Sequence, residues 1–324
     1  MKLETELIPL DRALLAEATD GFLPERVIDF HAHVMEARFY AADAVNPAFA
    51  GRTIDLERYT TAMGLFLGTR LVGDFVFPYP ARRTDRIGVN EWMIADARST
   101  PARQRHWLAA LVAPSDDPGL ASEWLRDGRC CGLKPYHLYA HDGDTRQTDI
   151  EAWAPEWMWR CCHEHEALLI LHLVKDASSA DPANREALLR LSTRYPGCRV
   201  VLAHVGRSFN HRTARGLKDL ASRPNIVVDT SAVTECEGIK LAVDVLGIDR
   251  VIYGSDYPIS HVRGRCVTAG DSFQWIYGEE MNNPRMTLVG IESLLSHRQA
   301  AEDLGLGRVE IEKLFHGNAQ ALLH

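Results

Sequence analysis

The sequence predicts a (β/α)8 barrel, in which eight parallel strands form a closed sheet surrounded by helices. The first observation is length, because 324 residues suit a single barrel domain. The second is a series of eight short apolar segments, spaced widely enough for a crossover helix between most neighbours. The third is that amphipathic, helix-like stretches lie between these segments. A GxGxxG sequence does not follow the first apolar segment, which argues against an open dinucleotide-binding sheet.

The order of the predicted elements follows the alternation that such a barrel requires. Asp181 and Pro182 provide a typical helix cap and first-turn proline for the fourth predicted helix. The strands are expected within residues 27–33, 65–77, 107–113, 130–136, 168–173, 199–204, 226–230 and 251–256. The helices are expected at 89–97, 119–127, 154–165, 182–195, 206–221 and 238–246.

Two longer segments, 35–64 and 259–284, contain no clear strand and are predicted to be loops. Each follows the C-terminal end of a strand, so both are expected to cover the active face as lids, while 78–88 adds to the pocket wall. Residues 1–25 are expected to form an N-terminal extension. We therefore expect one domain over residues 1–324.

Composition limits the classes of function. The net charge of −8 comes without a basic block or an acidic tail, which argues against binding of nucleic acid or of an anionic membrane surface. The N-terminus lacks a signal-peptide pattern, and no apolar run reaches the ~20 residues of a membrane helix. Seven cysteines without a CxxC pair disfavour a zinc ribbon. We expect a soluble cytoplasmic protein acting on a small molecule. The sequence leaves the oligomeric state open, and the helical stretch 286–323 favours a homodimer.

Ionisable residues stand at the ends of four predicted strands. His31 and His33, with Asp29 before them, are expected on one face of the first strand because side chains alternate along a strand. The fifth, sixth and eighth strands end in His172, His204 and Asp256. The C-terminal ends of barrel strands meet at the active face, so these groups are expected to converge there.

A lone histidine at a strand end is more often structural than a ligand, and the His31–His33 pair alone is a weak signal. The repetition of the pattern on four strands favours a metal site, because burying such groups unpaired costs several kcal/mol. Imidazoles with a carboxylate suit zinc, with manganese or iron as alternatives. A metal lowers the pKa of bound water towards ~7, and Asp256 is placed to take and return the proton.

Seven sequence motifs carry a family resemblance that extends from residue 27 to residue 323. They are IDFHAH, GLKPYH, LLILH, VVLAHVG, NIVVDTS, VIYGSDYP and LFHGNAQALL. The chain resembles the amidohydrolase superfamily, in the amidohydrolase-related branch that includes aminocarboxymuconate-semialdehyde decarboxylase and many TIM-barrel hydrolases. The motifs are specific for the superfamily but not for a substrate.

The resemblance implies that His31, His33, His172 and Asp256 bind one divalent cation. It implies that His204 lies beside the metal-bound water, where it polarises the substrate carbonyl and acts as an acid or base, or else helps to hold a second metal. Asp256 then has both a ligand and a catalytic role.

Lys134 has two interpretations. In binuclear members of the superfamily a carboxylated lysine on this strand bridges two metals, whereas the decarboxylase-like branch is usually mononuclear. We favour a cation that pairs with a substrate carboxylate or an aspartate. His137 either points into the pocket or lies at the surface.

Some further residues are weaker candidates. Asp29 and Ser255 are candidates to orient the ligand histidines. Five arginines near strand ends or lid segments can bind an anionic substrate, although a solvated role is favoured for each one. They are Arg52, Arg70, Arg82, Arg83 and Arg207.

Three functions follow. The leading one is a metal-dependent hydrolase that acts on an amide, a lactone or a related polarised carbonyl of a small anionic molecule through a metal-activated water. The alternative is a non-oxidative decarboxylase of an unsaturated or aromatic carboxylic acid. The third, a barrel that only binds, is disfavoured because all five expected site positions are filled.

Overall fold

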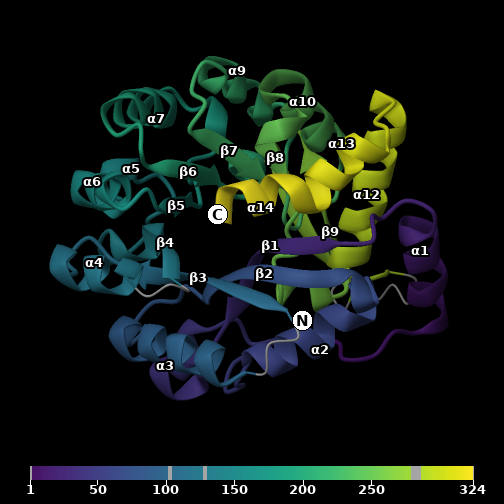
Figure 1. Cartoon of the computed structure of the whole chain (residues 1–324), viewed down its shortest axis with the longest axis horizontal. Helices are drawn as coiled ribbons and strands as arrows, with labels where there is room; N and C mark the ends of the chain where they lie inside the picture. Colours follow the sequence, from purple (N-terminus) through teal and green to yellow (C-terminus); the bar gives the residue numbers. More distant parts are fainter. Residues whose placement is uncertain (1, 101–103, 127–129, 279–285, 324) are drawn as a thin grey trace.

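Eight parallel strands form one sheet whose order in space is their order in the sequence, as the computed structural model shows (Figure 1). The structure describes residues 2–100, 104–126, 130–278 and 286–323. The strands are β1 (Val27–Val34), β2 (Leu71–Pro78), β3 (Arg105–Val112), β4 (Cys130–Pro135), β5 (Leu168–Leu171), β6 (Arg199–Leu202), β7 (Ile226–Asp229) and β8 (Val251–Ile252). The predicted barrel is confirmed.

Backbone hydrogen bonds between β1 and the residues that end and follow β8 close the barrel. The amide of Phe30 donates to the carbonyl of Tyr253 at 3.1 Å, and the amide of Asp256 donates to the carbonyl of His31 at 2.7 Å. Closure therefore places Asp256, from the end of the sheet, directly beside His31, from its beginning.

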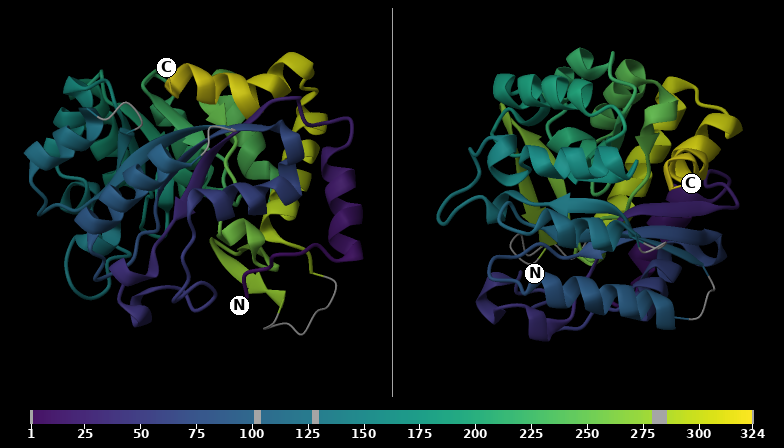
Figure 2. Two further views of the ribbon diagram at one scale, coloured as in Figure 1. Left: turned by 60° about the horizontal axis from the view of Figure 1, so that its bottom comes forward. Right: turned by 60° about the vertical axis from the view of Figure 1, so that its left-hand side comes forward.

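The interior of the barrel is filled by apolar side chains, among them Phe30 and Phe75, whose rings lie 4.9 Å apart. Ala319 and Leu323 of the C-terminal helix α14 (Asn318–Leu323) belong to the same cluster, so this helix closes one end of the barrel. Figure 2 shows α14 at one end of the molecule, with the green hairpin near the N-terminus at the other.

Helices surround the sheet (Figure 1). Before α14 they are α1 (Pro9–Thr19), α2 (Leu56–Leu67), α3 (Arg86–Ser99), α4 (Pro118–Arg126), α5 (Ile150–Trp153), α6 (Glu156–Glu164), α7 (Pro182–Arg194), α8 (Ala203–Arg207), α9 (Leu217–Leu220), α10 (Cys236–Leu246), α12 (Val289–Leu304) and α13 (Arg308–Glu312), with the π-helical η9 (Lys313–Gly317). As predicted, the Asp181 side chain caps α7, accepting from the amide of Asn184 at 3.0 Å. None of the helices in the described ranges has the length and apolar character needed to cross a bilayer.

The segment 35–64 is not a loop throughout, because α2 begins at Leu56. Asp55 caps this helix by accepting from the amide of Arg58 at 2.8 Å. Tyr59, Met63 and Leu67 lie on its buried face. This spacing is that of an amphipathic helix, which we did not recognise in the sequence.

The segment 259–284 is likewise not a simple loop. It contains an antiparallel hairpin of β9 (Gly264–Ala269) and β10 (Ser272–Tyr277), in which the aromatic residues Phe273, Trp275 and Tyr277 stand at every second position. Residues 279–284, like residue 127 at the end of the predicted helix 119–127, lie outside the described part of the chain.

The predicted helix 206–221 is wrong, because the chain is broken there into α8, the 3-10 turn η6 (Thr213–Gly216) and α9. Positive φ angles of 55°, 55°, 67° and 59° at His204, Val205, Gly206 and Arg207 form a left-handed turn that a right-handed helix cannot continue. Gly216 permits a close backbone approach, since a Cβ there would lie 1.9 Å from the carbonyl oxygen of Ser179.

Candidate metal centre and active site

Three predicted ligands meet where β1 and β8 close the barrel. Nε2 of His31 lies 3.4 Å, and Nε2 of His33 3.3 Å, from Oδ1 of Asp256. All three side chains are buried, and their potential ligand atoms lie within 4.8 Å of one another. Burial alone would raise the pKa of Asp256, but the surrounding histidines, His204 first, outweigh it and lower the pKa. Asp256 is therefore a carboxylate, the form that binds a cation.

The donor set fits a divalent cation, since two imidazoles and a carboxylate are typical zinc ligands. A second observation is the lack of protein partners: Nδ1 of His33 and Nδ1 of His172 are buried and make no hydrogen bond within the described part of the chain. His172 follows β5 and its ring lies 5.1 Å from that of His204. His172 is thus near the group but not within the set of three that lies inside 4.8 Å.

A cavity of about 320 Å³ at this end of the barrel brings most of the predicted site residues together. Aromatic side chains form part of its wall, among them Tyr79 directly after β2, Tyr136 directly after β4 and Trp275 of the hairpin. The predicted residues that line it are His31, His33, Lys134, His137, His172, His204 and Asp256.

Asp229, the last residue of β7, was not predicted to be part of the site. Its Oδ2 accepts a hydrogen bond from Nδ1 of His31 at 2.8 Å, and its Oδ1 accepts from the amide of His204 at 3.0 Å. Burial opposes ionisation, but the His31 ring and the hydroxyl of Ser231 outweigh it and hold the pKa of Asp229 below its usual range. The signal was present, because Asp229 ends a buried strand as His172 and Asp256 do.

His204 has one ring nitrogen bound by the protein. Nδ1 lies 2.8 Å from the carbonyl oxygen of Ser231, which only accepts, so Nδ1 carries the proton. The lone pair is then on Nε2, the nitrogen left to the cavity that His204 lines. Burial lowers the pKa of His204, which favours the neutral ring that accepts a proton. The left-handed turn α8 fixes the backbone that carries it.

Lys134 is fully buried at the end of β4. Its Nζ makes no hydrogen bond to any described residue and lies 4.6 Å from the ring centre of Phe77. Burial lowers the pKa of Lys134 to about 8, although the charges of Asp229 and Asp256 oppose this change. An unsatisfied ammonium in a polar cavity is a site for an anionic or carbonyl oxygen.

His137 and Arg207 differ in position. His137 lines the cavity, with Nδ1 2.8 Å from Oγ1 of Thr145, and burial lowers its pKa to about 4. Arg207 is not among the described residues that line the cavity. It donates to the carbonyl of Lys175 at 3.1 Å and stacks 5.0 Å above the ring of Phe273.

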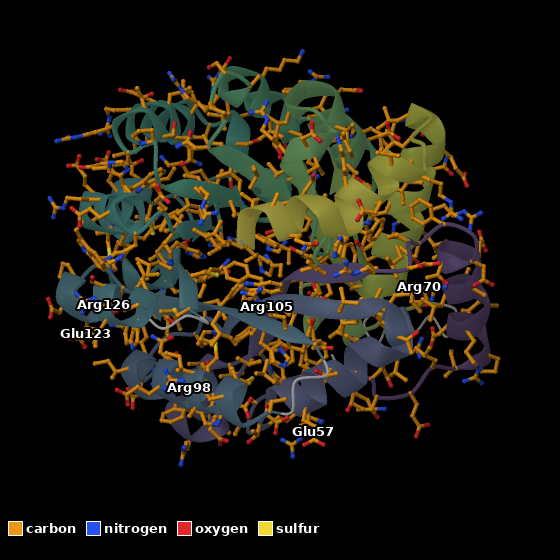
Figure 3. All side chains as sticks on the ribbon, viewed as in Figure 1. Glu57, Arg70, Arg98, Arg105, Glu123 and Arg126 are labelled. Atoms are coloured by element: carbon orange, nitrogen blue, oxygen red, sulfur yellow. The ribbon has the colours of Figure 1, made fainter. Side chains whose placement is uncertain are left out.

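The other arginines do not point to a shared anion site. Arg70, which Figure 3 labels, directly precedes β2, so it lies at the N-terminal ends of the strands, opposite the cavity. Arg82 donates to the carbonyls of His141 and Gly143, Arg83 pairs with Asp43 at the surface, and Arg52 lines a separate groove.

The expectation that Asp29 shares a face with His31 and His33 is wrong. A register shift between Asp29 and Ala32 interrupts the alternation of β1, as a β-bulge does. Asp29 instead accepts hydrogen bonds from the hydroxyl of Tyr59 on α2 at 3.0 Å and from the amide of Ser255 at 2.7 Å. Burial raises the pKa of Asp29 to about 7. Asp29 and Ser255 thus join β1 to the residues before Asp256 instead of contacting the histidine rings.

Comparisons with known proteins show the family to which the chain belongs. The profile of a family described as amidohydrolase matches residues 28–324. L-fucono-1,5-lactonase from Burkholderia ambifaria is 30% identical over 187 residues, which are 52% of this chain and only 58% of the lactonase. A zinc-bound amidohydrolase from Burkholderia multivorans superposes with a TM-score of 0.61 at 16% identity, over 92% of this chain and 99% of its own.

A third similar protein catalyses a different reaction. It is 5-carboxyvanillate decarboxylase from Novosphingobium aromaticivorans, in complex with manganese and 4-hydroxy-3-methoxy-5-nitrobenzoic acid. Its TM-score is 0.60 at 16% identity, over 99% of this chain and 98% of its own. Because the profile covers nearly the whole chain and the strand-end residues meet as expected, this chain belongs to the amidohydrolase family.

Proposed function

We propose that this protein is a metal-dependent hydrolase that opens a lactone or a related polarised carbonyl of a small anionic molecule. The observation that carries the proposal is the convergence of His31, His33 and Asp256 on one cavity that His204 also lines. The similarity to a lactonase supports the choice of a cyclic ester.

His31, His33 and Asp256 would hold the cation, with His172 as the fourth protein ligand and zinc as the first choice of metal. A divalent cation at such a site polarises a carbonyl and lowers the pKa of water. Asp256 can accept the proton of the attacking water through its carboxylate. His204 can accept or return a proton at Nε2, because its Nδ1–H is held by Ser231.

Lys134 is the group that we propose binds the negative charge of the substrate. Its ammonium group is positioned to bind a carboxylate or the carbonyl oxygen of the substrate, because it lines the cavity without a hydrogen-bonding partner in the described structure. This preference for an anion also suits the alternative function, in which a carboxylate of an unsaturated or aromatic acid leaves as carbon dioxide.

The test starts with metal analysis of the purified protein, followed by assays with and without a chelator. We expect a bound divalent cation and an activity that the chelator removes and added metal restores. Hydrolysis of a lactone in H₂¹⁸O is expected to place ¹⁸O in the product. Release of carbon dioxide without incorporation of solvent oxygen would establish the decarboxylase instead, and protein that binds no metal would refute both.

A further inference from the structure

We propose that the hairpin β9–β10 selects the substrate, and that Trp275 provides a flat surface on which a ring of the substrate stacks. This inference rests on the proposed function for its choice of ring, a hydroxylated lactone. Phe273, Trp275 and Tyr277 stand at alternate positions of β10 and therefore share one face, and the last two line the cavity.

On the opposite face of the same strand, Ser272 and Gln274 are exposed and Ile276 is half-buried. Gln274 lies there, and its side-chain amide donates to the backbone carbonyl of Trp275 at 2.9 Å. The hairpin therefore has a face that belongs to the cavity and a face that belongs to solvent, which provides a matched pair of positions for mutation.

Neighbouring rings hold the indole of Trp275 in place. The ring of Phe209 meets it edge to face, with centres 5.3 Å apart and planes at 70°. The ring of Tyr277 is nearly parallel to it, at 6.0 Å and 7°. Phe209 in turn stacks on His204 at 5.2 Å and 28°. Aromatic contacts thus connect the proposed stacking surface to the proposed acid–base histidine.

The barrel also anchors the hairpin. The side chain of Asn210 donates to the carbonyl of Ser272 at 2.8 Å, and the hydroxyl of Thr234 donates to the carbonyl of Cys266 at 2.6 Å. Both contacts are buried or partly buried. A surface fixed before binding loses little conformational freedom when a ligand arrives, which favours affinity.

The remaining cavity wall indicates what kind of ring fits. The side chains of Tyr79 and Tyr136 line the cavity, and neither hydroxyl makes a hydrogen bond to another described residue. Lys134 adds a third group that lacks such a bond. A flat apolar surface with hydrogen-bonding groups at its edge suits a ring that has a C–H face and oxygen substituents on its rim. A hydroxylated lactone has both, whereas an open-chain ester has no ring face.

The experiment compares Trp275→Leu, Trp275→Phe and Gln274→Ala, each as the full chain loaded with metal. Leucine keeps apolar volume but not a flat ring, phenylalanine keeps a ring, and the glutamine variant is the control on the solvent face. Substrates are an aldono-1,5-lactone and ethyl acetate, an open-chain ester that contains no ring. We expect Trp275→Leu to raise KM for the lactone about tenfold with little change in kcat. Trp275→Phe is expected to have a KM close to that of the unmodified protein.

For the open-chain ester we expect all three variants to resemble the unmodified protein. Equal KM values for the lactone in Trp275→Leu and Gln274→Ala would overturn the inference. A loss of kcat on both substrates would also overturn it, since Trp275 would then act only through Phe209 on His204. If the unmodified protein opens no lactone but decarboxylates an aromatic acid, the proposed function fails, and the same variants assayed on that acid test the stacking surface separately.

Discussion

Asp229 and His31 form a buried pair in which the ring Nδ1–H donates to the carboxylate at 2.8 Å. The pair leaves Nε2 of His31 unprotonated and directed to Asp256. Because the same carboxylate accepts from the amide of His204, a single side chain orients both a proposed ligand and a proposed acid–base group. Such outer partners of a metal site set ligand basicity and geometry.

Asp229→Asn is therefore expected to weaken metal binding by about 10- to 100-fold while the barrel still folds. The amide keeps the shape but loses the charge and one acceptor position. Competition with a chromogenic chelator measures the affinity. Asp219→Asn, at a surface carboxylate on α9 that pairs with Arg185, is the control and is expected to bind metal normally. Unchanged affinity in Asp229→Asn would contradict the role given to this residue.

His33→Ala and His204→Ala are both expected to lose activity, but for different reasons. Removing His33 takes away an imidazole 3.3 Å from Asp256, so the variant is expected to lose bound metal. Removing His204 is expected to leave metal content unchanged and to abolish turnover, because its Nε2 serves as an acid or base. Metal analysis alongside the assay separates the two. Equal loss of metal would show that His204 is itself a ligand of a binuclear site.

Lys134→Met distinguishes the two interpretations of the buried lysine. If the ammonium binds the substrate, the variant keeps one metal ion per chain and shows a raised KM for anionic substrates. If a carboxylated lysine bridges two metals, the unmodified protein holds two ions per chain and the variant loses at least one. Methionine is close to lysine in length, so the cavity wall is preserved. Metal stoichiometry and KM are the two measurements.

Stability is expected to fall as the pH drops from about 6.5 towards 4, in part because of His297 on α12. Burial lowers the pKa of this residue to about 4, and its Nδ1 lies 2.6 Å from the carbonyl oxygen of Ser293. In the unfolded chain this histidine is protonated as the pH falls below about 6.5, whereas in the folded chain it stays neutral until about pH 4. Its contribution to the free energy of unfolding is therefore complete above pH 6.5 and is lost as the pH falls towards 4.

The expected contribution is about 2 kcal/mol in the free energy of unfolding between pH 6.5 and 5 for one such histidine. Urea unfolding of the protein and of His297→Gln at both pH values measures it. The variant is expected to be less stable at pH 7 but less sensitive to acid. Burial also lowers the pKa of His261 to about 4. Because His261 is present in both proteins, part of the dependence of stability on pH remains in the variant. Parallel pH profiles would contradict the assignment to His297.

The strands and their end residues could be predicted because each depends on a local rule. A buried parallel strand is a short apolar run, and the first ionisable residue after it reaches the active face. This rule located His172, His204 and Asp256 from sequence alone. The same rule applies to Asp229 at the end of β7, but a single aspartate at a strand end does not by itself distinguish a residue that orients a ligand from one with a structural role.

Other features depend on contacts that sequence periodicity does not reveal. The bulge in β1 turns Asp29 towards Tyr59, and its cause is the pairing with β2 and the residues after β8. The hairpin β9–β10 has alternating aromatic residues, but its place over the cavity depends on contacts with Phe209. Arg207 is among the arginines for which the sequence favours a solvated role and permits substrate binding, yet it donates to the carbonyl of Lys175.

That turn has a consequence for attempts to make the protein more heat-resistant. Non-glycine residues in a left-handed conformation cost roughly 1 to 2 kcal/mol each, and Val205, a β-branched residue, is held there directly after His204. Val205→Gly would relieve this strain, but it would also remove a side chain that is fully buried in the core, which costs about 1.5 to 3 kcal/mol before the cavity is counted. We therefore expect the melting temperature of Val205→Gly not to rise and its turnover to fall, so a screen for thermostable variants is expected to retain valine beside His204.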